Sequence, residues 1–426
     1  MIWLETGQAD FAARFAELVE ARREGDADVA RDVAAILQRV RAEGDAAVAE
    51  LTQRFDGVEL DEAGWQISLD AAQAALAGLE PQLRDALQLA HDRIADYHAK
   101  QRPADRDEVD PLGVRLGARW TAVEAAGVYV PGGRAAYPSS VLMNAVPAKV
   151  AGVERLVMVT PTPGGAANPL VLAAAALAGV DEIWRVGGSQ AVAALAYGTA
   201  RIRPVDVITG PGNAWVAEAK RQVYGRVGID MVAGPSEILV VADADNDPEW
   251  IAADLLSQAE HDPTSQSILL TDDAAFAGAA TAAVETQLGA LDAAARASWD
   301  AHGAVVVLGS LAEAPALIDR LAPEHLELAV ADPDALFARV RHAGSVFLGR
   351  HTPEALGDYL AGPNHVLPTG RRARFSSGLG VTDFMKRTSF IACPAEAFAE
   401  LGPAAALLAN AEGLPAHARS VRVRLG

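Results

Sequence analysis

Residues that could carry acid–base or metal chemistry gather in the second half of the chain, where seven of the nine histidines follow residue 260. In the segment 255–261, Leu-Leu-Ser-Gln-Ala-Glu-His, Gln258 and His261 are three residues apart, so on a helix they share one face. An amide oxygen and an imidazole nitrogen are both acceptable ligands for a divalent metal such as zinc. The alternative is a histidine that merely ends a helix, where its cation suits the helix dipole, and spacing alone favours this second interpretation.

Two further segments carry groups that could move protons or bind a cation. Glu324 and His325 lie between an expected helix and an expected strand, where loop residues meet ligands. Glutamate and histidine are the usual acid–base groups near neutral pH, although a solvated turn explains an isolated Glu-His pair better. Asp358 lies in a loop with glycines and a proline, 356–365, and is either a hard oxygen ligand or a residue that stabilises the turn.

Three glycine-bearing segments follow expected strands: 130–133 (Val-Pro-Gly-Gly), 187–190 (Gly-Gly-Ser-Gln) and 210–213 (Gly-Pro-Gly-Asn). In open parallel sheets, ligands bind at the carboxyl ends of the strands, and glycine lets backbone N–H groups approach an anion at a helix N-terminus. These segments suggest a nucleotide or other anion site, although plain tight turns explain each of them nearly as well. The usual dinucleotide fingerprint, G-x-G-x-x-G, does not occur at 210–213.

The composition is that of a large globular protein. A length of 426 residues suggests two to three domains at about 150 residues each. The 36 basic and 56 acidic residues give a net charge of −20, which repels phosphate backbones and anionic lipid, so we expect neither nucleic-acid nor membrane partners. The first residues do not resemble a signal peptide, and no unbroken apolar stretch is long enough to span a bilayer, so we expect a cytoplasmic protein.

The single cysteine, Cys393, excludes a disulfide or a cysteine-only metal site within one chain. Its neighbours, Phe390-Ile391-Ala392 and Pro394, are apolar, and no histidine is near it in sequence. This environment predicts a buried structural thiol instead of a nucleophile.

The arrangement of elements predicts an α/β fold. Residues 11–98 have helical periodicity, and the region around 106–108, with Pro103 and Pro111, is expected to be a connector. From about residue 123 to Gly349, short β-rich runs alternate with helical stretches, which indicates parallel sheets with helices on both faces and enough chain for two sheets. The expected strands are 126–130, 156–160, 182–186, 206–209, 237–242, 267–271, 304–308, 326–330 and 345–348.

Taken in order, these segments resemble the histidinol dehydrogenase family. The stretch 229–242, Ile-Asp-Met-Val-Ala-Gly-Pro-Ser-Glu-Ile-Leu-Val-Val-Ala, followed by 254–261, is similar to the signature of that family. Further matches are the segments 128–133, 210–213, 323–327, 362–369 and 412–417. The resemblance covers essentially the whole chain. Ala361 departs from it, where serine is expected, but no role is assigned to that position.

The resemblance implies an enzyme that contains Zn²⁺, one ion per subunit, and uses two NAD to oxidise L-histidinol to L-histidine through the aldehyde, the last steps of histidine biosynthesis. It implies that Glu324 and His325 transfer protons. The implied metal ligands are Gln258, His261, Asp358 and His417. The implied substrate contacts are Ser236, Gln258, His261, His325, Asp358, Glu412 and His417. The implied NAD-binding residues are Tyr129, Gln190 and Asn213.

The resemblance also implies an architecture of two incomplete Rossmann-like parallel-sheet domains with small N- and C-terminal helical segments, in an intertwined homodimer. The expected boundaries are 1–20 for an N-terminal arm, 21–128 with 236–375 for the first domain, which carries the catalytic loops, 129–235 for the second domain on the NAD side, and 376–426 for a tail that reaches the partner subunit. Glu412 and His417 would then be donated across the interface.

Other functions stay open from the residues alone. A zinc hydrolase could use the same ligands to activate water, and another amino-alcohol dehydrogenase of the same fold is the closest alternative. A non-catalytic binding protein would need neither metal nor turnover. The basic residues Arg371, Arg372 and Arg374 could serve a pocket, although a solvated surface patch explains them better.

Overall fold

The computed structural model describes residues 1–21, 27–62, 64–132 and 137–426, so Gly133 of the glycine-bearing segment 130–133 lies outside the described residues. The chain forms two compact units. The larger unit comprises Met1–Gln101 and Glu124–Phe384, and the smaller unit comprises Arg102–Val123 and Met385–Gly426.

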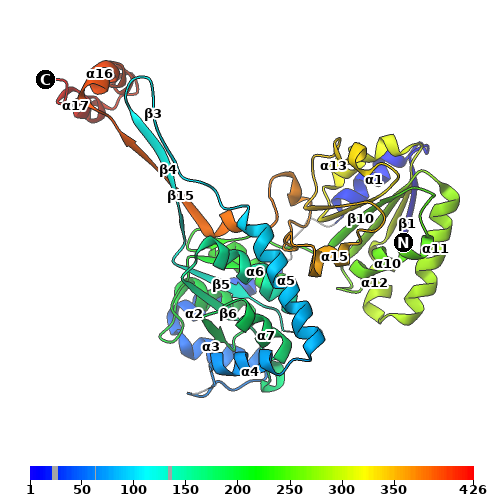
Figure 1. Cartoon of the computed structure of the whole chain (residues 1–426). Coiled ribbons are helices and arrows are strands. Elements are labelled where there is room, and N and C mark those ends of the chain that lie inside the picture. Colours follow the sequence, from blue (N-terminus) through cyan, green and yellow to red (C-terminus); the bar gives the residue numbers. More distant parts are fainter. Residues whose placement is uncertain (22–26, 63, 133–136) are drawn as a thin grey trace. The chain divides into compact units, whose positions relative to one another are not determined.

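The larger unit contains two six-stranded sheets, here named sheet A and sheet B (Figure 1). Sheet A is entirely parallel in its described pairings. Its strands, in spatial order, are β1 (Ile2–Glu5), β12 (Ala304–Val307), β11 (Gln266–Thr271), β10 (Glu237–Ala242), β13 (His325–Ala329) and β14 (Ser345–Leu348).

Helices cover both faces of sheet A, because its central strands are apolar on both sides. One face packs against α1 (Phe11–Glu20), α13 (Ala314–Leu321) and α14 (Pro333–Phe337). The other face packs against α10 (Pro248–Ala259), α11 (Ala274–Gln287) and α12 (Ala293–His302). The short helix α15 (Glu354–Tyr359) contacts α10. The polar side chains considered as a candidate site point to the second of these faces.

Sheet B is parallel except for one edge strand, β2, which is antiparallel to β7. In spatial order its strands are β2 (Gln66–Ile67), β7 (Glu182–Trp184), β6 (Arg155–Val159), β5 (Ala125–Tyr129), β8 (Val207–Thr209) and β9 (Gly228–Ile229). The strands predicted from the sequence in both sheets are confirmed, whereas β1, β2 and β9 were not predicted.

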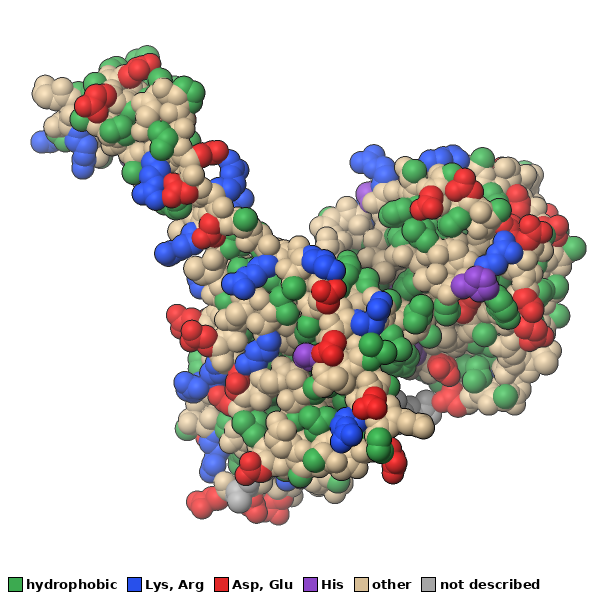
Figure 2. Space-filling model, in the orientation of Figure 1, with side chains coloured by type: hydrophobic (Ala, Val, Ile, Leu, Met, Phe, Trp, Pro, Cys, Tyr) green, Lys and Arg blue, Asp and Glu red, His purple; other side chains and the backbone are tan. Residues whose placement is uncertain are grey.

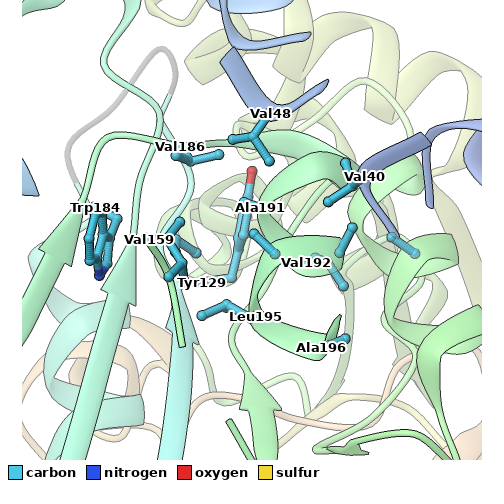
Figure 3. Packing of buried hydrophobic residues seen from close by; sticks show 14 of the residues in the cluster. Val40, Val48, Tyr129, Val159, Trp184, Val186, Ala191, Val192, Leu195 and Ala196 are labelled. Atoms are coloured by element: carbon cyan, nitrogen blue, oxygen red, sulfur yellow. The ribbon is translucent and has the colours of Figure 1, made fainter. Parts of the chain in front are cut away.

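Apolar side chains of sheet B and of helices on one of its faces form a hydrophobic core (Figure 3). These helices are α2 (Ala27–Glu43), α3 (Asp45–Asp56), α8 (Gly188–Tyr197) and α9 (Ala214–Val223). Val40 and Val48 from the first two helices belong to the same cluster as Val159 of β6 and Val192 of α8. A second group of helices packs together in the same unit, and one of them, α6, contacts β5 and β6. These helices are α4 (Leu69–Ala77), α5 (Pro81–Ala99), α6 (Pro138–Ala151) and α7 (Pro169–Leu177).

The packing groups the chain differently from the expected domain boundaries. Helices α2 and α3 were expected to belong with residues 236–375, but their apolar faces pack on sheet B. Residues 1–20 were expected to form an arm, but β1 extends sheet A at its edge and α1 packs on its face. Both differences arise because a parallel sheet accepts strands and helices that are distant in sequence, so the order of the chain does not fix their place.

The smaller unit is an antiparallel three-stranded sheet with two helices. Its strands, in the order β15-β4-β3, are Met385–Ala392, Arg115–Ala122 and Arg106–Val109. The region around 106–108 was expected to be a connector. That prediction is wrong, because β3 pairs with β4 through a turn at Asp110. The Asp110 carboxylate accepts hydrogen bonds from the Leu112 and Val114 N–H groups. The helices α16 (Ala395–Ala411) and α17 (Pro415–Arg422) follow β15 and contact each other.

The smaller unit leaves apolar side chains uncovered, and hydrophobic atoms are visible on its surface (Figure 2). Ile391, Leu407, Leu408 and Val423 are all exposed. Cys393 is exposed as well, so the prediction of a buried thiol is wrong, because a single thin sheet has no second layer to cover it. Among the helices of the described residues, none is long and apolar enough to cross a membrane.

Candidate functional site

Strand β13 directs polar side chains onto the face of sheet A that α10 covers. Successive side chains of a strand point to opposite faces. Leu326 and Leu328 belong to the apolar cluster with α1 and α13, and Ala329 belongs to the cluster with α10. His325 and Glu327 therefore face α10, and both are buried. Burying polar groups in an apolar layer costs free energy unless they have partners or a use, so this face is a candidate site.

Glu237, the first residue of β10, fixes both predicted proton-transfer groups through its backbone. Its N–H donates to Glu324 Oε2 at 2.9 Å, and its carbonyl accepts from His325 Nδ1 at 3.0 Å. A carbonyl can only accept, so His325 carries its proton on Nδ1 and presents the lone pair of Nε2. That Nε2 is buried and has no hydrogen-bond partner among the described residues. Both predicted proton-transfer groups, Glu324 and His325, are thus held by Glu237, and their roles remain a prediction.

Burial keeps His325 neutral, because desolvation lowers its pKa to about 3. A neutral imidazole with an unpartnered Nε2 can accept a proton from a bound molecule. His365, quoted above in the segment 362–369 but given no role, is buried in the same place, and desolvation lowers its pKa to about 4. Charge on His261 would further lower the pKa of both His325 and His365, which places the three imidazoles within electrostatic reach of one another.

Asp358 of α15 lies between two of these histidines. Its Oδ1 is 3.8 Å from His325 Nε2 and 3.9 Å from His365 Nδ1. Burial raises the pKa of Asp358 to about 7. A carboxylate in this position gives a cation an oxygen ligand close to the imidazole that could act as base.

Gln258 and His261 come from the C-terminal end of α10. The helix begins at Pro248, after Asp247 caps it by accepting from the Glu249 N–H, and Gln258 stands in its last turn. The Gln258 side chain is 0 % exposed, and neither its amide oxygen nor its nitrogen has a hydrogen-bond partner in the described parts of the chain. An unpaired buried amide of this kind calls for a ligand. His261 follows the helix end and its side chain is more open, although desolvation still lowers its pKa.

Glu354 was not found from the sequence. Its Oε1 is 3.3 Å from His325 Nδ1, and its side chain is 2 % exposed. One ligand atom each from His325, Glu354 and Asp358 lie within 4.8 Å of one another, close enough to surround one ion. A single glutamate in a short helix gives no signal in one sequence, because only the fold brings it to the histidine.

A buried pair of carboxyl groups lies behind this group. Glu327 on β13 and Asp254 on α10 are hydrogen-bonded to each other, which requires a shared proton. Burial and the neighbouring carboxyl raise the pKa of Glu327 to about 10, and burial raises the pKa of Glu354 well above its ordinary value. The sequence did hold a signal here, because Glu327 alternates with leucines in a strand that is otherwise apolar.

The remaining predicted residues of this site lie in two places. Ser236 precedes β10, and its carbonyl accepts from the Gln266 N–H at 2.9 Å. Glu412 ends α16 and His417 lies in α17, so both belong to the smaller unit, where both are exposed. Gln258, His261 and Asp358 therefore lie in the larger unit, whereas His417 lies in the smaller unit.

A second candidate site lies at the carboxyl ends of sheet B. The Tyr129 hydroxyl, at the end of β5, accepts from the Gly188 N–H at 3.1 Å, and burial raises the pKa of Tyr129 to about 12. Gln190 is buried, and both of its amide atoms lack partners within the described residues. Asn213 caps α9 by accepting from the Trp215 and Val216 N–H groups, and Ser189 Oγ donates to the Trp215 carbonyl at 3.0 Å.

Glycines allow the backbone of these strand ends to pack closely. A Cβ on Gly210 would lie 2.1 Å from the Tyr129 carbonyl oxygen, and a Cβ on Gly187 would lie 2.5 Å from Pro161. The predicted residues Tyr129, Gln190 and Asn213 thus lie on neighbouring strand ends with an unpaired buried amide among them. This arrangement fits a ligand with many acceptors, such as a dinucleotide.

The two sites lie at opposite edges of their sheets. Sheet B offers its carboxyl edge, as expected for an open parallel sheet. In sheet A, Glu237 and His325 are the first residues of their strands, so the histidine site lies at the amino edge. Gln258 reaches the same edge because α10 runs antiparallel to the strands and ends there.

The three arginines of uncertain role are engaged with neighbouring chain. Arg371 contacts Glu20 at the end of α1, whereas Arg372 and Arg374 donate to the carbonyls of Thr369 and Arg371. None of these contacts links them to the histidine site.

Comparison with known proteins shows which family this chain resembles. The family model described as histidinol dehydrogenase matches residues 19–425. Histidinol dehydrogenase of Zymomonas mobilis is 65% identical over 100% of this chain and 99% of that protein, and that of Rhodospirillum rubrum is 64% identical over 99% and 98%. The crystal structure of histidinol dehydrogenase from Elizabethkingia anophelis is similar with a TM-score of 0.93, at 36% identity, over 100% of this chain and 98% of that one.

Proposed function

Because the chain belongs to the histidinol dehydrogenase family, and is thus an oxidoreductase, we propose that it oxidises L-histidinol to L-histidine in two NAD-dependent steps. The single observation that carries this proposal is the state of His325. Its Nδ1–H is held by the Glu237 carbonyl, and its buried Nε2 is unpartnered among the described residues beside Asp358. Such a neutral imidazole suits the removal of a hydroxyl proton.

We assign a zinc ion to Gln258, His261 and Asp358, with His417 as the fourth ligand. The fit is supported by the donor set, which combines an amide oxygen, an imidazole nitrogen and a carboxylate. It is supported also by the unpaired Gln258 amide and by the several buried carboxyl groups whose pKa values are raised, because a cation would offset their mutual repulsion. When bound, zinc would anchor the nitrogen atoms of the substrate and fix its alcohol carbon.

We assign NAD to the carboxyl edge of sheet B, with Tyr129, Gln190 and Asn213 as contacts. Oxidation of an alcohol to an acid removes two hydrides, and zinc cannot accept them because it has no redox chemistry. NAD would accept one hydride in each step. The unpaired Gln190 amide and the close approach at Gly187 and Gly210 support a dinucleotide there.

His325 takes the hydroxyl proton in the first oxidation. The resulting imidazolium would be stabilised by the Glu237 carbonyl and by Glu354, whose Oε1 is 3.3 Å from Nδ1. The aldehyde must be hydrated before it can release a second hydride. We assign activation of that water to Glu324, which the Glu237 N–H holds in place, and His325 again accepts a proton. Acid–base groups of this kind contribute about 10²–10⁴-fold to rate.

We infer a homodimer in which the smaller unit of one subunit completes the site of the other. Two observations support this assignment. Three of the four residues assigned to zinc lie in the larger unit, and the exposed Glu412 and His417 lie in the smaller unit. The smaller unit also exposes Ile391, Leu407 and Leu408, and a partner would cover such apolar side chains.

The experiment that tests the function measures NADH formed per histidinol consumed. A ratio near two is expected for the complete oxidation to histidine. A ratio near one would mean that the product leaves as the aldehyde. An absence of NADH with histidinol, but formation of NADH with a different amino alcohol, would overturn the assignment of substrate. Release of product without NADH would indicate a zinc hydrolase.

A further inference from the structure

A buried ion pair lies behind the carboxyl edge of sheet B, and the chemistry described above does not use it. Lys220 is in α9, and Asp230 directly follows β9. Their side chains are 2% and 1% exposed, and Lys220 Nζ forms an ion pair with Asp230 Oδ1. Lysine is rarely buried to this extent, because its ammonium group loses hydration that a partner must replace. The pair therefore calls for a reason beyond packing.

The two charged groups hold one glycine from both sides. Lys220 Nζ donates to the Gly210 carbonyl at 2.9 Å, and the Gly210 N–H donates to Asp230 Oδ2 at 2.9 Å. Asp230 Oδ1 also accepts from the Met231 N–H at 2.6 Å. Both backbone polar groups of Gly210 are thus bound by a single ion pair.

The position of Gly210 determines the position of the loop 210–213. Its φ of +112° is a conformation that favours glycine, and the space for a Cβ is filled by the Tyr129 carbonyl oxygen. The loop 210–213 continues to Asn213, which caps α9, and the same helix carries Lys220. The loop, the helix and the ion pair therefore form one closed arrangement.

The arrangement also connects the two sheets. Asp230 begins the segment that leads from β9 of sheet B to β10 of sheet A, and Ser236 lies in that segment. Along it, the Gly234 N–H donates to Thr369 Oγ1. Burial, and to a lesser extent the charge of Asp230, raise the pKa of Asp383, so a second acidic group lies near this ion pair. A shift of Lys220 or Asp230 would move the loop relative to the catalytic strand.

We propose that Lys220 and Asp230 are positioning residues for the nicotinamide dinucleotide, because they hold the Gly210 loop in the conformation that receives it. This inference rests on the proposed function, since it takes the carboxyl edge of sheet B as the NAD site. Loss of the pair should weaken NAD binding and leave the binding of histidinol and metal unchanged. A merely structural role would lower thermal stability without changing the affinity for NAD.

The variant Lys220→Met removes the charge and the donor to the Gly210 carbonyl while it keeps most of the length of the side chain. We expect its dissociation constant for NAD, measured by calorimetry at a temperature well below its unfolding, to rise about tenfold or more. The KM for NAD should rise by the same factor, whereas the KM for histidinol should stay within about twofold of the original value.

A single variant leaves Asp230 charged and buried, which can prevent folding. The double variant Lys220→Met, Asp230→Asn removes both charges, and its single amide oxygen can still accept from the Gly210 N–H, while the Met231 N–H loses its acceptor. This protein should fold, because no uncompensated charge remains. It should nevertheless bind NAD about tenfold more weakly, because the Gly210 carbonyl has lost its donor.

The matched control is another ion pair of the same sheet, at its amino edge. Arg155, the first residue of β6, binds Glu182, the first residue of β7, through contacts of 2.6 and 3.1 Å. The variant Arg155→Gln should lower thermal stability and leave the dissociation constant for NAD unchanged. If the double variant binds NAD as tightly as the unmodified protein, or if Arg155→Gln weakens NAD binding equally, the inference is overturned.

The outcome distinguishes this inference from the proposed function. An unmodified protein that binds NAD but forms no NADH from histidinol would overturn the proposed function alone. Variants that keep full NAD affinity in a protein that does oxidise histidinol would overturn the inference alone. An unmodified protein that does not bind NAD would overturn both.

Discussion

Substitution of Glu327 by glutamine tests the shared proton of the buried acid pair. Glu327 is 1% exposed and hydrogen-bonded to Asp254, and its pKa is raised from 4.5 to about 10, first by burial and then by the neighbouring carboxyl. The folded protein therefore keeps a proton that the unfolded chain releases. The amide of Glu327→Gln has nearly the same shape and donates to Asp254 without needing that proton.

The sign and size of the effect follow from proton linkage. A raised pKa in the folded state gives stability that is fully present below the unfolded value near 4.5 and is lost as pH rises toward the folded value near 10. In the interval between them, one extra bound proton makes the free energy of unfolding fall by about 1.4 kcal/mol per pH unit. Between pH 6 and pH 8 the unmodified protein should lose roughly 3 kcal/mol that the Glu327→Gln variant keeps.

Urea unfolding at pH 6, 7 and 8 with a metal chelator present measures this difference, since the chelator removes the linkage to metal binding. The exposed residue Glu59 supplies the control, and Glu59→Gln should follow the pH dependence of the unmodified protein. Parallel pH dependences for Glu327→Gln and the unmodified protein would refute the reasoning, because they would mean that Glu327 is ionised in the folded state.

Four further predictions concern the candidate site. His325→Asn should lower kcat by about 10²–10⁴-fold at unchanged metal content, and loss of the metal in this variant would show that His325 is a ligand. Glu324→Gln should slow oxidation of the aldehyde more than oxidation of the alcohol, and an equal loss in both half-reactions would contradict its assigned role. Removal of metal by a chelator should abolish NADH formation, and added Zn²⁺ should restore it. Mixing two inactive variants, His417→Ala and His325→Asn, should restore part of the activity by forming mixed dimers with one intact site, whereas no recovery would contradict a shared site.

The strands of the two parallel sheets could be predicted because they are apolar runs that end at glycine or aspartate. The strands β2 and β9 contain two residues each, which is too short to leave a pattern in the sequence. Strand β3, Arg-Asp-Glu-Val, is exposed along its whole length and looks like a loop. It pairs with β4 nearby, whereas the other partner of β4, strand β15, comes from the far end of the chain.

The candidate site was predicted where a residue type and its neighbours carry the chemistry. The residues alone marked Glu324 with His325, and Gln258 with His261, as candidates, but they favoured a plain turn and a helix end. The resemblance to the family assigned their roles. Glu354 and His365 could not be assigned from the residues, because their roles depend on a 3.3 Å approach to His325 and a 3.9 Å approach to Asp358. Proximity of this kind arises from the fold and not from sequence spacing.

The smaller unit has a consequence for biosynthesis of the chain. Strand β4 pairs with β15, so Ala122 cannot pair until Met385, about 260 residues later, has been synthesised. At ribosomal rates of roughly 5–20 residues per second, that wait is on the order of 13–50 seconds. Throughout this interval the nascent β3–β4 hairpin has an open edge, to which other nascent chains could add. The hairpin carries charged side chains of both signs, and the Arg115–Asp107 and Arg106–Glu108 ion pairs hinder such additions while translation finishes.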